Sequence, residues 1–336
     1  MTELLTEMAM AYFRSRVLAA AARLKVADAL QDQTRSVDEL AQTCQAHPES
    51  LYRLLRALAS FGIVAETEPA SFVLMPLGQP LRQDHPRSEW SSVVFWADLL
   101  ADSWSHLTEC VRSNENAFRV AEREGVALRW SKDPGARAIF GAVMGTGSAQ
   151  SYAPIVRSWD FSNYHTIADL GGGGGALIEA VLEAYPQARG ILADRGDFIQ
   201  NAAPRFAQQP RCELVATDLS ESVPAGADVH MLKHVLHGCT DEAAVKILRN
   251  CRATLEPQGR LLVIEFVLPD VVDHASPELE QRLMSDLNML AVTGGRERSA
   301  REWRDLLDAA GFACIRMVPV PADLVSIIEA GSTQAS

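Results

Sequence analysis

Five consecutive glycines, Gly171 to Gly175, separate a short apolar segment, TIADL (166–170), from the apolar segment ALIEAVLEAYP (176–186). Backbone without side chains can turn sharply, and the first N–H groups of the helix that follows have no partner within that helix. A strand that turns in this way into a helix is typical of α/β folds, where ligands bind at the helix N-terminus. A glycine-rich turn without a ligand is the alternative interpretation.

The alternation continues beyond the glycines. RGILAD (189–194), CELVATDL (212–219), DVHMLK (228–233) and GRLLVIEFVL (259–268) are short and nearly continuous apolar runs. Such runs between helical segments predict a doubly wound, mostly parallel sheet that is buried on both faces. ACIRMVPV and LVSIIEA, near the end, lie too close together for a helix between them. We therefore expect them to form an antiparallel hairpin at the sheet edge.

The first half of the chain is helical in pattern. Residues 13–30 are apolar nearly all round, which predicts one helix that is buried in its domain or against a partner subunit. Ser36 and Glu39 form a capping-box pattern, and a second amphipathic helix should stop near Gly62. GIVAE and SFVLMP then suggest a β-hairpin. Helix, helix and hairpin form a winged-helix layout, which raises the hypothesis of DNA binding.

The net charge and the cysteine spacing disfavour several classes of partner and compartment. A net charge of −12 disfavours both a nucleic-acid partner and an anionic membrane surface. No apolar run approaches the roughly 20 residues that span a bilayer, and the acidic start does not resemble a signal peptide. The six cysteines form no CxxC pair, as expected of free thiols in a reducing compartment. We predict a cytoplasmic protein without nucleic-acid or membrane partners.

Carboxylates follow three of the predicted strands. Asp169 precedes the glycines, while Asp194 and Asp218 end the next two strands. Asp194 can accept hydrogen bonds from ribose hydroxyls and Asp218 from an adenine amino group, so the pattern suits a nucleoside, and an acidic cradle suits the positive charges of S-adenosylmethionine. The glycines also match the dinucleotide pattern GxGxxA, so a NAD(P)-dependent oxidoreductase remains an alternative.

From Arg14 to Ala330 the chain resembles the S-adenosylmethionine-dependent O-methyltransferases of small aromatic molecules, including the microbial branch that acts on phenazines and polyketides. The similar stretches are IADLGGGGGALIEAVLEAYPQARGILAD, MLKHVLH, DEAAVKILRNCRATLEPQGRLLVIEFVLPD and DLNMLAVTGGRERSAREWRDLLDAAGF. The resemblance implies a seven-stranded class I methyltransferase sheet, a homodimer and no metal. It also implies a helical winged-helix dimerisation domain (1–100), linking helices at the substrate pocket (101–155) and an S-adenosylmethionine domain (156–336).

The resemblance assigns roles to individual residues. His237 is the expected general base, with Glu265 and Glu297 as its supports. The expected cofactor contacts, including those from the glycine turn, are Asp169, Gly171, Gly173, Gly175, Asp194, Asp218, Leu219, Lys233 and Ser148. The expected substrate contacts are Phe140, Met144, Asn288 and Met289. The segment 195–196 is Arg-Gly where relatives have Leu-Pro, which leaves the adjoining loop open.

Three histidines lie close together in VHMLKHVLHGCTDE (229–242). A three-histidine metal site is one hypothesis; the other places His230 inside a strand, makes His234 a packing or pocket-wall residue and leaves His237 as the base. A histidine suffices for a phenol, whose pKa near ~10 is further lowered by a nearby sulfonium. Relatives continue the motif with Asp-Trp, whereas this chain has Gly238 and Cys239. The loss of an indole should open space beside the base.

The sequence therefore predicts an O-methyltransferase that acts on a phenolic or enolic hydroxyl of an aromatic secondary metabolite and releases S-adenosylhomocysteine. Methylation of a ring nitrogen or an amine, which needs proximity but no strong base, is the nearer alternative. A non-catalytic binding module is a further alternative, but it gives no reason for the His237, Glu265 and Glu297 set.

Overall fold

The computed structural model describes residues 2–128, 132–133, 135–145, 149–256, 258–273, 275–321 and 323–332. The chain forms two compact units: residues 1–105 with 126–143, and residues 106–125 with 144–336. The segment 101–155, which was expected to link two domains, is divided between these units. Among the described residues, no helix is both long and apolar enough to cross a membrane.

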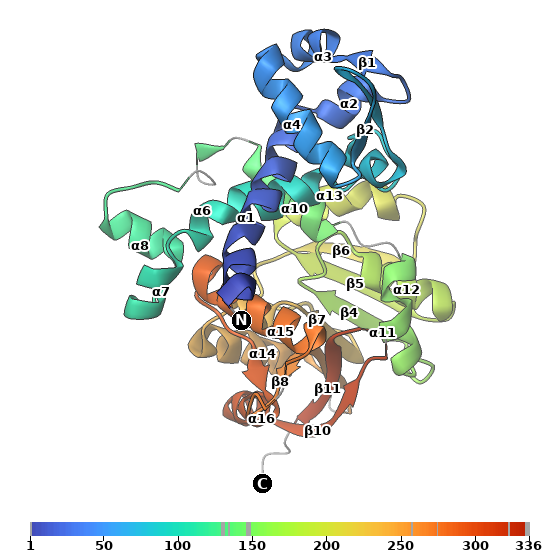
Figure 1. Ribbon diagram of the computed structural model, residues 1–336. Coiled ribbons are helices and arrows are strands. Elements are labelled where there is room, and N and C mark those ends of the chain that lie inside the picture. Colours follow the sequence, from blue (N-terminus) through green and yellow to red (C-terminus); the bar gives the residue numbers. More distant parts are fainter. Residues whose placement is uncertain are drawn as a thin grey trace. The chain divides into compact units, whose positions relative to one another are not determined.

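The first unit is mainly helical and carries a small antiparallel sheet of order β1-β3-β2 (Figure 1). Its elements are α1 (Thr2–Arg23), α2 (Val26–Leu30), β1 (Arg35–Ser36), α3 (Val37–Cys44), α4 (Pro48–Ser60), β2 (Val64–Glu68), β3 (Ser71–Leu74), the 3₁₀ helix η1 (Pro76–Leu81), α5 (Trp90–Val94), the π-helix η2 (Phe95–Leu99), α6 (Leu100–Trp104) and most of α10 (Ala136–Gly145). The predicted helix–helix–hairpin order is present.

The prediction of one helix over residues 13–30 is wrong. The chain breaks between α1 and α2, where Lys25 adopts a left-handed φ of 53°. The predicted capping box is confirmed, because Ser36 caps α3 and Glu39 returns a hydrogen bond to the backbone of Ser36. Gly62, with φ of 75°, follows α4 at the expected stop.

The second unit contains a sheet of order β10-β11-β8-β7-β4-β5-β6, with the short β9 beside β8. Its elements are α7 (Leu107–Ser113), α8 (Ala117–Arg123), η3 (Ala149–Tyr152), α11 (Ala153–Ser158), β4 (Thr166–Leu170), α12 (Ala176–Ala184), β5 (Arg189–Asp194), α13 (Gly196–Phe206), β6 (Cys212–Ala216), β7 (Val229–Lys233), η4 (Leu236–Gly238), α14 (Asp241–Thr254), β8 (Arg260–Leu268), α15 (Pro277–Val292), β9 (Arg298–Ser299), α16 (Ala300–Ala309), β10 (Phe312–Pro319) and β11 (Val325–Ser332).

The strand pairing confirms the predicted doubly wound sheet. β4, β5, β6, β7 and β8 pair in parallel, while β10 and β11 form the predicted antiparallel hairpin at one edge. Helices α14 and α16 cover one face with an apolar core, and α11, α12 and α13 cover the other (Figure 1). Because parallel strands end at the same edge, the segments after β4, β5, β7 and the end of β8 come together there.

Candidate active site

The glycine turn after β4 needs its glycines. Gly171, Gly173 and Gly175 have φ of 72°, 56° and 77°, a left-handed region that side chains disfavour. A Cβ on Gly175 would also collide with the ring of Phe206. The N–H of Gly173 donates to Oδ2 of Asp194 at 2.8 Å, which ties the turn to the end of β5. The turn thus presents open backbone at the ligand-binding edge of the sheet.

Asp169 is a buried acid at the end of β4. Its side chain is 1% exposed, and neither carboxylate oxygen has a hydrogen-bond partner among the described residues. Burial raises the pKa of Asp169 to about 7, and the nearby Asp194 carboxylate adds to the rise. A buried carboxylate to which no described residue donates a hydrogen bond fits a site for a donor or a positive charge on a ligand.

The other predicted cofactor acids differ from Asp169. Asp194 already accepts N–H groups from Gly173 and Arg195 at 2.8 and 2.7 Å, and burial raises its pKa. Asp218 is exposed, and the hydrogen bond from Ser220 lowers its pKa. These two carboxylates therefore keep only part of their accepting capacity for a ligand.

Leu219 and Lys233 lie at the same edge. Leu219 is buried, and its δ1 methyl is 3.7 Å from the point where a Cβ on Gly171 would lie. Burial lowers the pKa of Lys233, whose Nζ lies 5.2 Å from the ring centre of Tyr152. Ser148, the remaining predicted cofactor contact, lies outside the described residues. The roles of all these side chains stay predictions.

The register of β7 and β8 places the loop after β7 (residues 234–239) beside Glu265. Lys233 is opposite Ile264, so the next residue, His234, reaches the level of Glu265. The N–H of His234 still bonds the carbonyl of Ile264 at 3.2 Å, but its φ of 53° turns the chain out of the sheet. Leu236, His237 and Gly238 then form the short η4 helix.

Glu265 binds the turn and His234. Its Oε1 accepts the N–H groups of Val235, Leu236 and His237 at 2.9, 3.0 and 3.3 Å. Its Oε2 lies 3.1 Å from Nδ1 of His234, a hydrogen bond, and 3.7 Å from Nδ1 of His237, an ion-pair distance. Complete burial opposes ionisation, but the two imidazoles and the backbone N–H groups lower the pKa of Glu265. Glu265 is therefore the anchor of the whole loop.

Glu297 is the hydrogen-bond partner of His237. Its Oε1 lies 2.8 Å from Nδ1 of His237 and accepts the hydroxyl of Ser285 at 2.7 Å. Its own N–H donates to Asp286 at 2.8 Å, and the β9 strand that follows pairs with β8. Burial acts against a proton on His237, but Glu265 and Glu297 outweigh it and raise the pKa of this histidine.

The three histidines have three different environments. His230 is fully buried in β7 without a hydrogen-bond partner among the described residues, and burial lowers its pKa to about 4. Because it lies in the core, it does not join the other two, and a three-histidine metal site is not formed. The rings of His234 and His237 stack at 5.0 Å with an interplanar angle of 23°. Together with Glu265 they hold atoms within 4.8 Å of one another that could ligate a metal.

Two residues that sequence reasoning missed hold this loop in place. Arg298 is fully buried and donates to Asp241 at 2.7 Å and to the carbonyls of Leu236 and Cys239 at 3.1 and 3.2 Å. Gly295 packs so closely that a Cβ there would collide with the carbonyl oxygen of His237. The GGRERS stretch contains both residues, but only the contacts show that they support the loop.

Gly238 and Cys239, where this chain departs from its relatives, have different surroundings. A Cβ on Gly238 would meet nothing within 4 Å, whereas the space expected from the lost indole concerns residue 239 and stays a prediction. Cys239 packs against the core, its thiol lies 3.6 Å from the carbonyl of Val235, and burial raises its pKa. The interpretation of Cys239 as a small filling residue is favoured over that of a reactive thiol.

The predicted substrate contacts belong to both units. Phe140 is in the first unit, where its ring lies 5.8 Å from that of Phe95. Met144, Asn288 and Met289 belong to the second unit, where Met144 is exposed, Asn288 is half-buried and Met289 is buried. Their contact with a substrate stays a prediction.

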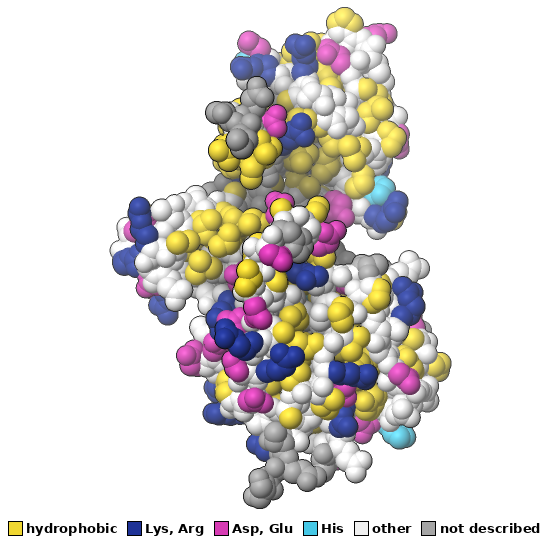
Figure 2. Space-filling view, turned by 60° about the horizontal axis from the view of Figure 1, so that its bottom comes forward, with side chains coloured by type: hydrophobic (Ala, Val, Ile, Leu, Met, Phe, Trp, Pro, Cys, Tyr) yellow, Lys and Arg dark blue, Asp and Glu magenta, His cyan; other side chains and the backbone are white. Residues whose placement is uncertain are grey.

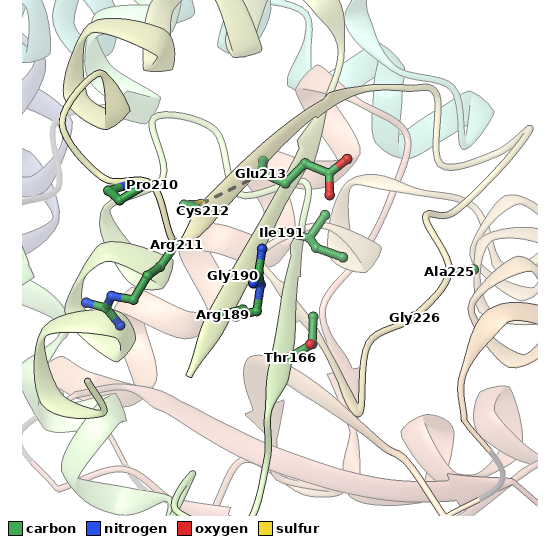
Figure 3. A pocket seen from close by; sticks show the side chains of 10 residues that line it. All are labelled: Thr166, Arg189, Gly190, Ile191, Pro210, Arg211, Cys212, Glu213, Ala225 and Gly226. Carbon is green, nitrogen blue, oxygen red and sulfur yellow. Dashed lines mark hydrogen bonds between the residues drawn. The ribbon is translucent and has the colours of Figure 1, made fainter. Parts of the chain in front are cut away.

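A hollow of about 420 Å³ lies at the opposite end of the sheet (Figure 3). Its walls come from the first residues of β4, β5 and β6, including Thr166, Arg189 and Cys212. Arg211, which also lines the hollow, donates to the carbonyls of Leu182, Tyr185 and Ala188, which follow or end α12. Since ligands of such sheets bind at the carboxyl ends of the strands, this hollow is not the candidate site.

A doubly wound sheet with a glycine turn and acids at the carboxyl ends of its strands is typical of nucleoside-binding enzymes, and an imidazole–carboxylate pair lies at the same edge. Residues 104–313 match the O-methyltransferase domain family, and residues 6–83 match the O-methyltransferase dimerisation domain. The chain belongs to the O-methyltransferase family. The predicted family, fold class, enzyme class and methyl donor, S-adenosylmethionine, are thereby confirmed.

Three similar proteins illustrate the range of the family. The phenazine O-methyltransferase PhzM of Lysobacter antibioticus is 34% identical over 98% of this chain and 96% of its own length. The 8-amino-8-demethylriboflavin N,N-dimethyltransferase of Streptomyces davaonensis is 33% identical over 94% of this chain and 91% of its own length. The O-methyltransferase NcsB1 from neocarzinostatin biosynthesis, solved with S-adenosylmethionine and 2-hydroxy-5-methyl naphthoic acid, has a TM-score of 0.78, 29% identity and coverage of 95% and 96%.

Proposed function

We propose that this protein transfers the methyl group of S-adenosylmethionine to a phenolic or enolic hydroxyl of an aromatic secondary metabolite. The observation that carries the proposal is the hydrogen bond between His237, whose side chain is 15% exposed, and the buried Glu297 at the carboxyl edge of the sheet. The phenazine in the name of PhzM and the naphthoic acid in the complex with NcsB1 are aromatic ring systems, which supports the acceptor class.

The chemistry needs a base that is neutral before transfer and stabilised when protonated. If Nδ1–H of His237 donates to Glu297, the lone pair of Nε2 is free to accept the hydroxyl proton of the acceptor. Glu265 and Glu297 raise the pKa of His237, which reduces the uphill cost of taking a proton from a phenol. When bound, S-adenosylmethionine supplies a methyl group that is already activated on a sulfonium.

The residues present fit that cofactor. Asp169 offers two unsatisfied carboxylate oxygens for its positive groups, and the open backbone of Gly171–Gly175 permits close approach. Asp194 would hold the ribose, Asp218 and Leu219 the adenine, and Lys233 would form a further contact. His237 then holds the acceptor proton at Nε2.

Methylation of nitrogen is the second candidate function. The riboflavin-related relative named above is an N,N-dimethyltransferase, so the same scaffold supports nitrogen acceptors. A neutral amine already presents a lone pair, and proximity alone would suffice. The hydrogen bond between His237 and the buried Glu297 favours the oxygen acceptor, because an amine acceptor gives no need for such a base.

One variant separates the two candidates. His237→Gln should keep the dissociation constant of S-adenosylmethionine, measured by calorimetry, and lower turnover of a hydroxyl acceptor by about 100-fold or more. Near-normal turnover in the variant would remove His237 as the base and favour a nitrogen acceptor. Tight binding of NAD(P) without binding of S-adenosylmethionine would instead overturn the cofactor assignment.

The homodimer and the cytoplasmic location are part of the proposal. The first unit matches a dimerisation domain, and the beginning of α1 exposes apolar side chains, among them Leu4, Leu5, Met8 and Phe13, that a second copy would cover. All six cysteines are free, as in a reducing compartment. On the face seen in Figure 2, acidic and basic side chains intermingle over the surface, which supports the absence of a nucleic-acid partner.

A further inference from the structure

The loop after β7 carries two imidazole–carboxylate pairs, of which the proposed methyl transfer uses one. His237 is paired with Glu297 at 2.8 Å, and His234 is paired with Glu265 at 3.1 Å. Both carboxylates are buried, whereas the side chains of His234 and His237 are 28% and 15% exposed. The second pair therefore reaches solvent at least as well as the first.

The two rings are held in parallel. They stack with centroids 5.0 Å apart and an angle of 23°, and the edge of the His234 ring also packs against Phe266 at 5.1 Å. Each Nδ1 faces its own carboxylate, so each Nε2 lies on the ring side away from these acids. No described residue forms a hydrogen bond with either Nε2 atom. Two free ring nitrogens thus lie side by side at the edge of the sheet where the acceptor must bind.

The backbone of His234 adopts an uncommon conformation where the two rings stack. Its φ of 53° lies in the left-handed region, which residues other than glycine adopt uncommonly, although histidine does so more often than most. Strained conformations of this kind persist where the surrounding contacts enforce them, often at functional sites. Here the contacts that enforce it are those of Glu265 with His234 and with the turn behind it.

We propose that His234 is a second acceptor-binding residue, which selects aromatic acceptors that carry a hydroxyl or amino group adjacent to the hydroxyl that is methylated. The inference rests on the proposed O-methyl transfer. With Nδ1–H donated to Glu265, Nε2 of His234 accepts a hydrogen bond from the neighbouring group, while Nε2 of His237 takes the proton of the reacting hydroxyl. His234 thereby recognises the group beside the reacting hydroxyl, and His237 acts as the base.

The environments of the two rings support this division. Burial and the charges of Lys233 and His237 lower the pKa of His234, although Glu265 opposes them, whereas the pKa of His237 is raised. A pair of titratable groups shifted in opposite directions is typical of sites in which they have different roles. A neutral His234 with its Nδ1–H committed to Glu265 can only accept at Nε2. It should therefore favour a donor on the acceptor and disfavour an ether or a carbonyl.

The test compares three acceptors that share one ring system. 2,3-Dihydroxynaphthalene has a donor beside the reacting hydroxyl, 3-methoxy-2-naphthol has only an acceptor there, and 2-naphthol has neither. Release of S-adenosylhomocysteine gives kcat/KM for the full-length protein, and calorimetry gives the binding of each naphthol to the complex with S-adenosylhomocysteine. The variants are His234→Phe, which keeps an aromatic ring for the stack, and His234→Asn, which tolerates the left-handed backbone.

We expect the wild-type protein to prefer the diol over both other naphthols by about 10- to 100-fold in kcat/KM, because a site built to bind a substrate hydroxyl discriminates against its absence. Both variants should lose this preference through a fall on the diol alone. An equal fall on all three acceptors would show a structural role, and no preference in the wild-type protein would also overturn the proposal.

A failure of the proposed methyl transfer can be distinguished from a failure of the inference about His234. If the protein binds S-adenosylmethionine but methylates none of the naphthols, the calorimetric preference for the diol and its loss in both His234 variants still decide the inference. A preference that is present in binding supports His234 as an acceptor-binding residue, and equal binding of the three compounds, or binding of none, counts against it. Failure to bind S-adenosylmethionine counts against the proposed function itself.

Discussion

Nδ1 of His237 lies 2.8 Å from Oε1 of Glu297, a residue 60 positions further along the chain. The contact depends on β9, which begins at the next residue and pairs with the end of β8. The pairing of two short strands therefore determines the hydrogen bond that orients the proposed base.

The pH dependence of catalysis should reflect the raised pKa of His237 beside Glu297. His237 acts as a base when it is unprotonated, and its pKa is raised above 6.5, so activity should rise with pH through a midpoint above 6.5. Glu297→Gln removes one of the charges that raise the pKa. The rising limb of kcat/KM should therefore move to lower pH, with a maximum about 10- to 100-fold below that of the wild-type protein.

Ser285→Ala is the matched control, since it removes the other hydrogen bond to Oε1 of Glu297 but leaves every charge in place. Its rising limb should stay where the wild-type limb lies. A limb that is unchanged in Glu297→Gln would show that this carboxylate does not control the protonation of His237.

A methyl group at residue 295 should damage the loop without touching the cofactor edge. Gly295→Ala places a Cβ against the carbonyl oxygen of His237 and the backbone of Gly238, so the loop must move. We expect kcat to fall by about 10-fold or more, because small displacements of a catalytic group are costly, while the Kd of S-adenosylmethionine stays constant.

Gly238→Ala adds the same methyl group to the same loop, but its Cβ would meet nothing within 4 Å and its φ is not left-handed. It should keep kcat within about 2-fold and the thermal midpoint close to that of the wild-type protein. Equal losses in the two variants would contradict the steric explanation.

The buried carboxylate of Asp169 should lower the stability of the folded protein at high pH while it strengthens ligand binding. Its pKa is about 7 in the folded protein against 3.8 ordinarily, so the folded state binds more protons than the unfolded state between about pH 4 and pH 7. The free energy of unfolding should therefore fall as pH rises through this window. Above it, the stabilisation that protonated Asp169 gives the folded state is lost completely. Asp169→Asn should therefore raise the free energy of unfolding at pH 8 by about 2–4 kcal/mol, measured by urea denaturation.

The same substitution should weaken the binding of S-adenosylmethionine by at least about 10-fold, since it removes a buried negative charge from the site. Asp218→Asn is the stability control, because Asp218 is exposed and should change the free energy of unfolding by less than about 0.5 kcal/mol. A loss of stability in Asp169→Asn at pH 8 would refute the raised pKa.

Two arginines that both bind Asp241 should differ in their importance. Arg298→Met leaves the carbonyls of Leu236 and Cys239 without their donor in a buried setting and should lower the free energy of unfolding by about 2–4 kcal/mol. Arg296→Met removes a half-exposed ion pair with Asp241 and should cost less than about 1 kcal/mol. Similar losses in urea denaturation would show that the shared salt bridge, and not the carbonyl contacts, stabilises the loop.

The sequence by itself determined the sheet and the position of the ligand edge. Apolar runs of strand length, the glycines at 171–175 and the capping box at Ser36 are local signals, and a local signal acts through neighbours in the chain. The left-handed φ of Lys25 escaped prediction, because an uninterrupted apolar pattern does not reveal where a helix breaks. Similarity of the GGRERS and MLKHVLH stretches to a family supplied the candidates for the site.

Only the tertiary structure decided which carboxylate serves which histidine. Both glutamates were expected to support His237. Glu265 accepts hydrogen bonds from the ring of His234 and from backbone N–H groups of the turn, that of His237 among them, whereas Glu297 is hydrogen-bonded to the ring of His237. The register of β7 against β8 places Glu265 level with His234, and β9 places Glu297 beside His237. Contacts between segments 30 to 60 residues apart depend on strand register and packing, which no local pattern encodes.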